Sequence, residues 1–408
     1  MTGMTDVIVV GGGLNGPALA LALAQAGLSV TVIDAQPAQV RAGAAFDGRA
    51  YALALASQRL LQAVGVWQAV RDHAQPILRI LTSDSTPGGG PSPLFLGFDG
   101  AEIEEGVMGY MLEDRFLYAA LLAAMERQPG LVHLPATRVV AQEVGPAAAT
   151  VTLADGRQIA ARLIVGADGR ASGTAERAGI GRVGHSYGQT ALVCALDHDR
   201  PHGGTAQQVF LPDGPLAILP LPGNRSSIVW SETEAKARTI AALSDDDFLK
   251  VLRPVFGDHL GAIRLAGPRF SYPLTLTLAE RYVAARVALA GDAAHGVHPI
   301  AGQGLNLGLR DVAALAEVLV AARRRGEDIG APDVLARYEQ WRRPDSTFLA
   351  LGMDTINRLF SNDSAVLRGL RDLGLGAVNR LPGLRRAFIR QAAGVGGHPP
   401  RLLTGRPL

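Results

Sequence analysis

Glycine and aspartate recur where strands are expected to end in this 408-residue sequence. Gly11, Gly13 and Gly16 follow the apolar stretch DVIVV and precede a helix. Glycines at this spacing allow a tight turn and a close approach of the backbone to a pyrophosphate, which the positive end of the helix attracts. Asp34 ends the next expected strand, where a carboxylate accepts hydrogen bonds from ribose hydroxyls. The pattern predicts a dinucleotide site but does not separate NAD from FAD.

Two later stretches end in a similar way. LIVGADGRAS carries Asp168 and Gly169, and VALAGDAAHGVHPIAGQGLNLGLRD carries Gly291 and Asp292. A carboxylate at a strand end suits ribityl hydroxyls, and glycines let backbone amides face a flavin ring. Each stretch alone is also consistent with a tight turn. The three stretches together, in this order, favour a flavin nucleotide.

The elements around these residues predict an α/β fold. Residues 1–35 have the pattern of a strand, a turn, a helix and a second strand. A helix over LEDRFLYAALLAAMERQPG is followed by a hairpin whose turn is Asp155-Gly156. Residues 186–272 consist of short β-rich segments separated by Pro and Gly, which is typical of an antiparallel sheet. From residue 332 the chain is expected to be helical.

We therefore predict a Rossmann-like FAD-binding domain with an inserted antiparallel β-sheet substrate domain and a helical C-terminus. The FAD-binding domain is expected to be discontinuous, with residues 1–75, 106–185 and 273–330. The substrate domain takes residues 76–105 and 186–272, and the C-terminal helical region takes residues 331–408. The acidic run SDDDFLK is interpreted as a helix cap and not as a functional site.

Composition excludes several classes of protein. The net charge of +2 is too balanced for a nucleic-acid-binding protein that relies on bulk charge. The single cysteine, Cys194, excludes an internal disulfide, and nothing suggests a thiolate metal site. The N-terminus lacks the basic region of a signal peptide, and no apolar run reaches the roughly 20 residues of a membrane span. We therefore expect a cytoplasmic protein.

These motifs, in this order, resemble those of the group A flavin monooxygenases, the para-hydroxybenzoate hydroxylase-like FAD enzymes. The resemblance covers nearly the whole chain, and ADGRAS and GDAAHGVHPIAGQGLNLGLRD match two of the family's motifs. DGRAYALA, LAILPL and YEQWRR are similar to the ubiquinone-biosynthesis branch, the 2-octaprenylphenol and 2-octaprenyl-6-methoxyphenol hydroxylase type. The ribose acid here is Asp34 where Glu is commoner, a change that shortens its reach but keeps the acceptor.

The resemblance implies that FAD is the cofactor and assigns its contacts. The residues that it places at FAD are Gly11, Gly13 and Gly16 (pyrophosphate), Asp34 (adenosine ribose), Arg49, Gly291 and Asp292 (phosphate and ribityl region), Asp168 and Gly169 (near the pyrophosphate, with a link to NAD(P)H), Arg115, and Pro299, Gly302, Gln303, Gly304, Leu305 and Asn306 (isoalloxazine ring). Backbone amides of the last group would stabilise negative charge on reduced flavin. Taken alone, Arg49 is better interpreted as an ordinary surface arginine.

The reaction that the resemblance implies is the hydroxylation of a polyprenylated phenol in ubiquinone biosynthesis. NAD(P)H reduces the flavin, O2 forms a C4a-hydroperoxide, and one oxygen passes to the ring, which requires a closed apolar site. No second glycine fingerprint is present, so NAD(P)H is expected to bind transiently. His298 is a candidate to face flavin or substrate, or else to support its loop. No catalytic base is assigned, and Tyr51, Tyr187 and Tyr272 remain candidates.

The C-terminal region and the class of function leave alternatives open. A basic segment is consistent with contact to anionic lipid or to another quinone-biosynthesis protein, and equally with a solvated surface. Its arginines are Arg368, Arg371, Arg380, Arg385, Arg386 and Arg390. The alternative functions are an FAD enzyme that acts on another phenol, and a non-catalytic flavin- or lipid-binding subunit. The ring position, the prenyl length and the choice between NADH and NADPH are not indicated by the sequence.

Overall fold

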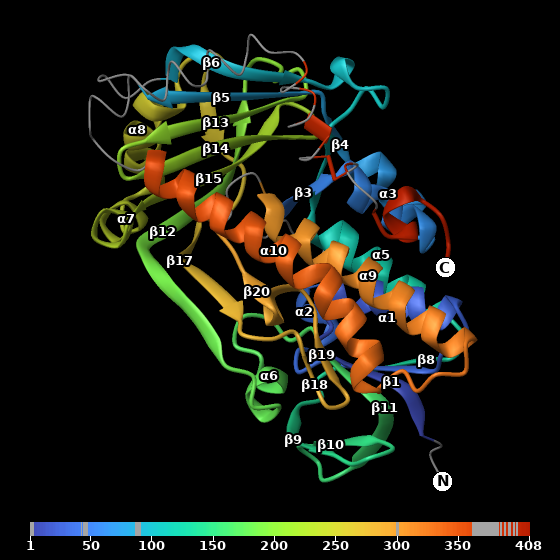
Figure 1. Cartoon of the computed structure of the whole chain (residues 1–408). Coiled ribbons are helices and arrows are strands. Elements are labelled where there is room, and N and C mark those ends of the chain that lie inside the picture. The colour runs from blue at the N-terminus through green and yellow to red at the C-terminus, as the bar shows by residue number, and fades with distance from the viewer. Residues whose placement is uncertain are drawn as a thin grey trace.

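Two large sheets and the helices around them form most of the part of the chain that the structure describes (Figure 1). The computed structural model describes residues 4–41, 43, 48–85, 91–298, 302–360 and 399–408, and the single residues 383, 386, 389, 390, 393, 394 and 396. In Figure 1 the mostly parallel sheet lies below and the mostly antiparallel sheet lies above.

The mostly parallel sheet has β1 (Thr5–Val10) at its centre, parallel to both β2 (Val30–Ile33) and β11 (Gln158–Gly166). The remaining strands are β8 (Leu131–Leu134) beside β2, β19 (Val287–Leu289) and β18 (Val283–Ala284) beyond β11, and β9 (Val139–Val144) and β10 (Ala149–Leu153), which are joined to β11. Val7, Ile8 and Val9 are fully buried, as expected for a parallel strand that is covered on both faces. The predicted hairpin at Asp155-Gly156 is confirmed as β10 and β11.

Helices cover this sheet and include the two predicted from the start and the end of the sequence. α1 (Asn15–Gln25) follows β1 and packs against α9 (Gln303–Arg324), and its Ala and Leu side chains are buried almost throughout. The other helices here are α2 (Ala38–Arg41), α5 (Asp114–Arg127), α6 (Gly173–Arg177), the short η3 (Gly291–Ala293) and α10 (Pro332–Phe360). The helix expected from residue 332 is confirmed as α10, which packs against α9.

The second sheet is built largely from the segment predicted to be antiparallel. Its order is β20 (His295–Gly296), β17 (Phe270–Ala279), β12 (Arg182–His198), β15 (Arg225–Thr233), β14 (Gly214–Leu221), β13 (Thr205–Leu211), β5 (Arg79–Ser85) and β6 (Pro91–Asp99), with β16 (Ile263–Leu265) paired to β12. One pairing differs from the prediction, because β13 and β5 run parallel. These two strands are far apart in sequence and no hairpin joins them, so nothing forces an antiparallel pairing.

Large side chains fill one face of this sheet. Leu192, Trp230 and Leu216 occupy successive strands on that face and pack, as part of one apolar cluster, with α7 (Glu234–Ala241) and α8 (Asp245–Phe256). The Ser244 hydroxyl accepts a hydrogen bond from the Asp247 amide at 3.2 Å, so the interpretation of SDDDFLK as a helix cap is confirmed. The opposite face is therefore the one left for the rest of the molecule.

A small third sheet connects the two large ones. It consists of β3 (Ala50–Ala54), β7 (Gly109–Glu113) and β4 (Gln75–Ile77), with α3 (Leu55–Ala63), α4 (Trp67–Val70) and the short helices η1 (Arg71–His73), η2 (Gly100–Glu102) and η5 (Arg401–Thr404) nearby in the chain or in space. Ile77 and Met111 of this sheet pack with Ala195 and Leu221 of the antiparallel sheet. The face opposite α7 and α8 is thereby turned toward the FAD-binding half.

The domain division from the sequence remains a proposal. The strands β5 and β6 lie in residues 76–105 and join the antiparallel sheet, as that division requires. The proposed boundaries at residues 185–186 and 272–273 fall inside β12 and β17, both of which run continuously through the sheet. The ends of these two strands are therefore better candidates for the domain boundaries.

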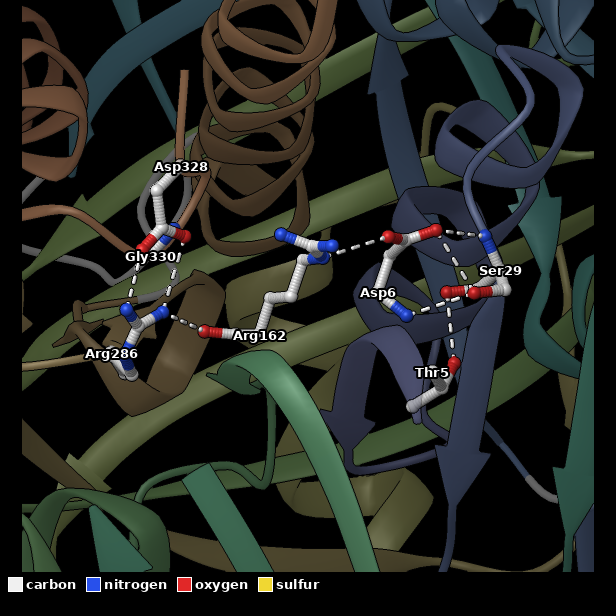
Figure 2. Close-up of polar contacts among 7 residues, drawn as sticks. All are labelled: Thr5, Asp6, Ser29, Arg162, Arg286, Asp328 and Gly330. Carbon is white, nitrogen blue, oxygen red and sulfur yellow. Dashed lines mark hydrogen bonds and ion pairs between the residues drawn. The ribbon is translucent and has the colours of Figure 1, made fainter. Parts of the chain in front are cut away.

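Polar side chains tie the amino ends of the parallel strands together (Figure 2). The Asp6 carboxylate accepts hydrogen bonds from the Ser29 amide and hydroxyl, both at 2.9 Å, and lies 3.5 Å from Arg162. Arg286 is 6% exposed; it pairs with Asp328 and donates to the Arg162 carbonyl at 3.0 Å. These contacts join β1, β2, β11 and the segment before β19 to the loop between α9 and α10, so this edge is closed by the chain itself.

The basic C-terminal segment falls mostly outside the described residues, since of its six arginines only Arg386 and Arg390 are included. Within the part of the chain that the structure describes, no helix combines the length and apolar character needed to cross a bilayer. Cys194 is buried and forms no disulfide, and burial raises the pKa of its thiol to about 12.

Candidate active site

The carboxyl ends of the parallel strands bring the predicted motifs to one edge of the sheet. The Gly11 amide donates to the Ile33 carbonyl at 2.8 Å, and the Ala167 amide donates to the Val10 carbonyl at 2.8 Å. The Ala290 amide likewise donates to Gly166 at 2.9 Å. The glycine turn, the Asp34 strand end, the Asp168 loop and the Gly291 loop are therefore neighbours, at the edge where α/β proteins bind nucleotides.

Close packing of backbone explains the glycines of the first turn. Gly11 has φ +114°, and a Cβ there would overlap the Ala167 carbonyl oxygen. A Cβ on Gly16 would overlap the Gly11 carbonyl oxygen. Gly12, which the sequence did not single out, is required as well, because its missing side chain makes room for the Asp34 carboxylate. Gly13 lies in the same turn, directly before α1.

Asp34 is turned toward that glycine turn. It is 8% exposed, its Oδ1 accepts a hydrogen bond from the Gln36 amide at 3.0 Å, and its Oδ2 lies against Gly12. The carboxylate is therefore fixed next to the backbone that would hold a pyrophosphate, which is the position expected for a ribose acceptor.

Asn15, the first residue of α1, is a candidate site residue that sequence reasoning missed. Its side chain lies between Gly291 and Gly308, and a Cβ on either glycine would overlap its amide. Among the described residues, its buried Oδ1 has no hydrogen-bond partner. An amide oxygen accepts hydrogen bonds from hydroxyl groups, so a ribityl or ribose hydroxyl would satisfy it. A glycine-lined cradle with an unsatisfied acceptor fits a flavin nucleotide.

The Asp168 side chain is committed to its own loop. Its carboxylate accepts hydrogen bonds from the Ser172 hydroxyl and from the Thr174 amide and hydroxyl, the latter two at 3.0 and 2.9 Å. Gly169 follows with φ +79°, a conformation that favours glycine. The loop therefore offers its backbone to a ligand, and the predicted contact of Asp168 with FAD would be made by main-chain atoms.

The Asp292 carboxylate is partly exposed. Its side chain is 39% exposed, and its Oδ2 lies 3.2 Å from Nε of Arg170, which comes from the Asp168 loop. Arg170 also donates to the Val297 carbonyl at 3.3 Å, and Arg182 donates to the Arg170 and Ala293 carbonyls. These contacts join the two loops side by side, and Arg170 is a connector that the sequence did not reveal.

A buried charged cluster supports the Gly291 loop from below. Asp311 of α9 accepts hydrogen bonds from the Gly291 amide at 3.0 Å, from His295 at 2.5 Å and from Arg342 of α10 at 2.9 Å. Burial opposes the charge on Asp311, but His295 and Arg342 outweigh it and hold the pKa of its carboxyl below the ordinary value. Burial also opposes the charge on His295, yet Asp311 raises the pKa of that ring. His295 is thus part of the buried support of the Gly291 loop.

The start of α9 faces the same edge. Gly302 caps the helix with φ +62°, and a Cβ there would come within 2.8 Å of Ala52 Cβ. Gln303, Gly304 and Leu305 form the first turn and are partly exposed, and a Cβ on Gly304 would meet open space. Helix N-termini carry unpaired amides and partial positive charge, which suits the electron-rich edge of a reduced flavin.

Asn306 holds this helix start in place through its side chain. Its Oδ1 accepts from the Ala54 amide and the Ser57 hydroxyl at 2.8 and 2.7 Å, and its Nδ2 donates to the Ala52 and Gly302 carbonyls at 2.7 and 3.0 Å. All ordinary hydrogen-bonding positions of the amide are used, so Asn306 would orient the flavin loop without donating to the ring. Pro299, predicted to flank the ring, lies outside the described residues.

The two predicted arginines meet at the start of α5. A guanidinium nitrogen of Arg49 lies 3.5 Å from the fully buried carboxylate of Asp114, and the Arg49 side chain is 44% exposed. Nε of Arg115 lies 2.6 Å from Glu113, and its guanidinium stacks over Phe116 at 4.5 Å. Each arginine therefore pairs with a carboxylate of this chain, Arg49 with Asp114 and Arg115 with Glu113. Contact with phosphate remains a prediction for each arginine.

Comparison with known proteins identifies the family. Residues 4–349 match the family described as FAD binding domain, which is more than half of the chain. Ubiquinone hydroxylase UbiL of Rhodospirillum rubrum is 50% identical over 408 residues, covering 99% of this chain and 94% of that protein. The chain belongs to the FAD-dependent hydroxylase family of ubiquinone biosynthesis.

A second relative from this family and one solved structure are similar over nearly the full length. The 3-demethoxyubiquinol 3-hydroxylase of Escherichia coli is 38% identical, covering 96% of this chain and 99% of that protein. The solved structure of p-nitrophenol 4-monooxygenase PnpA from Pseudomonas putida superposes with a TM-score of 0.80 at 20% identity, covering 98% of this chain and 100% of that one. The predicted family, the para-hydroxybenzoate hydroxylase-like fold, the FAD cofactor and the monooxygenase class are confirmed.

Proposed function

We propose that this flavin hydroxylase adds oxygen to the ring of a polyprenylated phenol in ubiquinone biosynthesis, with NAD(P)H and O2 as co-substrates. Its relatives are named as ubiquinone hydroxylases and a demethoxyubiquinol hydroxylase, which supports this substrate class. The observation that carries the proposal is an apolar row on the face of the antiparallel sheet that is turned away from α7 and α8.

This apolar row consists of Phe270, Val193, Val229 and Ala217, which lie opposite one another on β17, β12, β15 and β14. Val193, Val229 and Ala217 are only half-buried, and Phe270 is 41% exposed. Burial of such apolar surface by a ligand is favourable, at about 25 cal/mol per Å². The row therefore suits an aromatic ring and the start of a hydrocarbon tail.

The apolar row lies close to the loop that carries Arg49 and to the Gly291 loop. A Cβ on Gly48 would come within 2.6 Å of the Phe270 ring, which places the row next to the loop that carries Arg49. Tyr272 is the next residue of β17 that faces the same way as Phe270. Strand β17 also pairs with β20 through Thr277 and Gly296, so the strand at the end of the row is hydrogen-bonded to the chain that follows the Gly291 loop.

Each part of the chain then has a definable task in the reaction. Bound FAD would supply the electron transfer from NAD(P)H and the activation of O2. The glycine turn and Asn15 would hold the nucleotide, and the amides at the start of α9 would face negative charge on its ring. The apolar row would orient the phenol and keep water away from the reacting oxygen, a requirement for productive transfer.

The test is complementation of a bacterium from which one ubiquinone-ring hydroxylase has been deleted. Expression of this chain is expected to restore ubiquinone and to remove the prenylphenol that lacks one oxygen, as measured by mass spectrometry. Ala217→Phe, which fills the apolar row, is expected to reduce the restored quinone at least about tenfold, because a clash in a packed site costs more than 1.4 kcal/mol.

The matched control is Ala235→Phe, which places the same ring on the exposed surface of α7 and is expected to complement like the unmodified chain. FAD content of both purified variants should equal that of the unmodified protein. Failure to restore ubiquinone in every such deletion strain would contradict the substrate class and would favour a hydroxylase of another phenol.

Location and protein partners remain predictions. A polyprenyl substrate resides in a bilayer, which supports action at the cytoplasmic face of the membrane, and the basic C-terminal segment is the proposed point of contact. Sedimentation with anionic vesicles, with and without residues 361–398, would test this.

A further inference from the structure

Three buried histidines differ in how their ring nitrogens are satisfied. In His198, Nδ1 lies 2.7 Å from the Arg200 carbonyl and Nε2 lies 3.0 Å from the Ser226 hydroxyl. In His295, Nε2 is 2.5 Å from Asp311. In His298, which is 1% exposed, neither nitrogen has a hydrogen-bond partner among the described residues. An unsatisfied buried polar atom destabilises the fold, so two on one ring call for a partner that arrives with a ligand.

His298 lies where the two halves of the molecule meet. It follows β20 in the loop that leads to Gly302 and the start of α9. The ring of Tyr187, from β12, stands edge-on to it at 4.9 Å with an interplanar angle of 87°. Val297, the preceding residue, accepts a hydrogen bond from Arg170, whose side chain also runs along Gly296. The His298 imidazole therefore belongs to the loop before α9 and contacts the antiparallel sheet through Tyr187.

Burial, assisted by one nearby charge, keeps the ring of His298 neutral. Burial lowers the pKa of the ring most, Arg170 lowers it further, and Asp354 of α10 opposes both, so that the pKa of His298 falls to about 4. His185 is 3.1 Å from Asp354, and its ring stands edge-on to Tyr187 with 4.9 Å between the ring centroids. A neutral imidazole has one acceptor and one donor nitrogen, and a ring this weakly basic accepts a hydrogen bond without taking the proton.

Strand pairing links this ring to the face proposed to bind substrate, since β20, which ends two residues before His298, pairs with β17, the strand that carries Tyr272 and Phe270. Resting on the phenol hydroxylase function above, we propose that His298 accepts a hydrogen bond from the hydroxyl group of the phenolic substrate and so selects rings that carry one. A site that buries a polar group for this purpose rejects a ligand that lacks the matching hydroxyl, because the group is then left unpaired.

The test compares the binding of 2-geranylphenol and geranylbenzene, which differ only in the hydroxyl, to the FAD-loaded protein by flavin difference absorbance. The unmodified protein is expected to bind the phenol at least about tenfold more tightly, the equivalent of one hydrogen bond. In His298→Leu this preference should disappear, because the hydrocarbon ring no longer faces an unpaired nitrogen. His298→Gln, which retains a polar amide, should keep part of it.

His185→Leu is the matched control. It removes the other histidine whose ring contacts Tyr187 and is expected to leave the preference for the phenol unchanged. A measurement that needs no variant uses carbon-13-labelled histidine: the His298 resonance should move on addition of the phenol and not of the hydrocarbon.

Equal binding of the two compounds by the unmodified protein, or an unchanged preference in His298→Leu, would overturn the inference while leaving a phenol-binding site intact. Absence of binding by either compound would contradict the proposed substrate class itself, and the inference would fall with it.

Discussion

The two edges of the parallel sheet are built from the same strands but differ in how far their polar groups are hydrogen-bonded within the chain. At the amino edge, Asp6, Arg162 and Arg286 are bonded to one another's segments and to neighbouring loops (Figure 2). At the carboxyl edge, glycines replace side chains, and the Asn15 acceptor is unsatisfied among the described residues. One edge therefore contributes stability, whereas the other keeps backbone and polar atoms free for a ligand.

The difference shows how a binding site can be recognised without a ligand. Closed polar networks satisfy their members inside the chain, and each member stabilises the fold. Groups that remain unsatisfied, held in position by a rigid support such as the Asp311 cluster, lower stability unless a ligand pairs with them. Changes at the two edges should accordingly separate FAD retention from folding.

The largest effect is expected for Gly11→Val at the open edge. A side chain there would overlap the Ala167 carbonyl and would have to adopt φ +114°, so the turn that faces the pyrophosphate would be displaced. FAD bound per protein after gel filtration should fall to background. Gly352→Ala, at a helical position with open space around it, is the control and should retain full FAD. Equal retention by both variants would contradict the assignment of the turn.

Asp311→Asn should produce the next largest effect, because it leaves His295 buried without its anion and removes one of the two carboxylates that pair with Arg342, the other being Asp345. The expected loss of stability is about 3–5 kcal/mol in urea denaturation near pH 6. The folded pKa of Asp311 is lowered, so its contribution exists above about pH 4 and is lost as pH falls through the folded value.

The pH dependence gives the check on that buried cluster. The folded pKa of His295 is raised, so its contribution is complete below about pH 6.5 and is lost as pH rises through the folded value. The stability gap between the unmodified protein and Asp311→Asn should therefore be widest between about pH 4 and 6.5. A gap that stays constant from pH 3 to 9 would refute the charged cluster.

Arg286→Ala tests the closed edge. Loss of its bonds to Asp328 and to the Arg162 and Pro146 carbonyls is expected to cost about 2–3 kcal/mol, less than at Asp311 because the Asp328 side chain is 38% exposed. FAD bound per folded protein should not change. The control Arg157→Ala removes an exposed pair with Asp155 and should leave the urea midpoint unaltered. If Arg286→Ala instead released FAD, the separation of the two edges would be wrong.

The smallest effect is expected for Asp292→Ala. Its carboxylate is partly exposed and shared with Arg170, so its removal should weaken FAD binding by several-fold and leave thermal stability nearly unchanged. Fluorescence titration of apoprotein with FAD measures this, with Asp258→Ala, an exposed carboxylate on the antiparallel half, as control. Identical FAD affinity in the two variants would remove Asp292 from the predicted ribityl contact.

The local parts of this design were predictable from sequence. Gly11 and Asp34 directly follow strands, and Gly16 lies in the first turn of α1. The geometry of these positions depends on near neighbours, and the hairpin at Asp155-Gly156 and the Ser244 cap obey equally local rules. The family resemblance extended this to the FAD cofactor, which the comparisons confirm.

The remaining site depends on contacts between distant segments, which no local pattern specifies. Asn15 meets Gly291 and Gly308, and Arg170 meets Asp292, only after the sheet has formed. The side chains of Asp168 and Asn306 find hydrogen-bond partners within the chain, which the sequence did not indicate for the same reason. The parallel pairing of β5 with β13 likewise follows from the path of the chain and not from strand composition.

The most direct test of the central claim is a single-turnover reaction of FAD-loaded protein with NAD(P)H, isotopically labelled O2 and a prenylphenol, followed by mass spectrometry. The predicted result is a prenylphenol that has gained one labelled oxygen atom on its ring, with the second atom released as water. Oxidation of NAD(P)H that yields hydrogen peroxide and unchanged phenol, or a ring oxygen that originates from water, would contradict it.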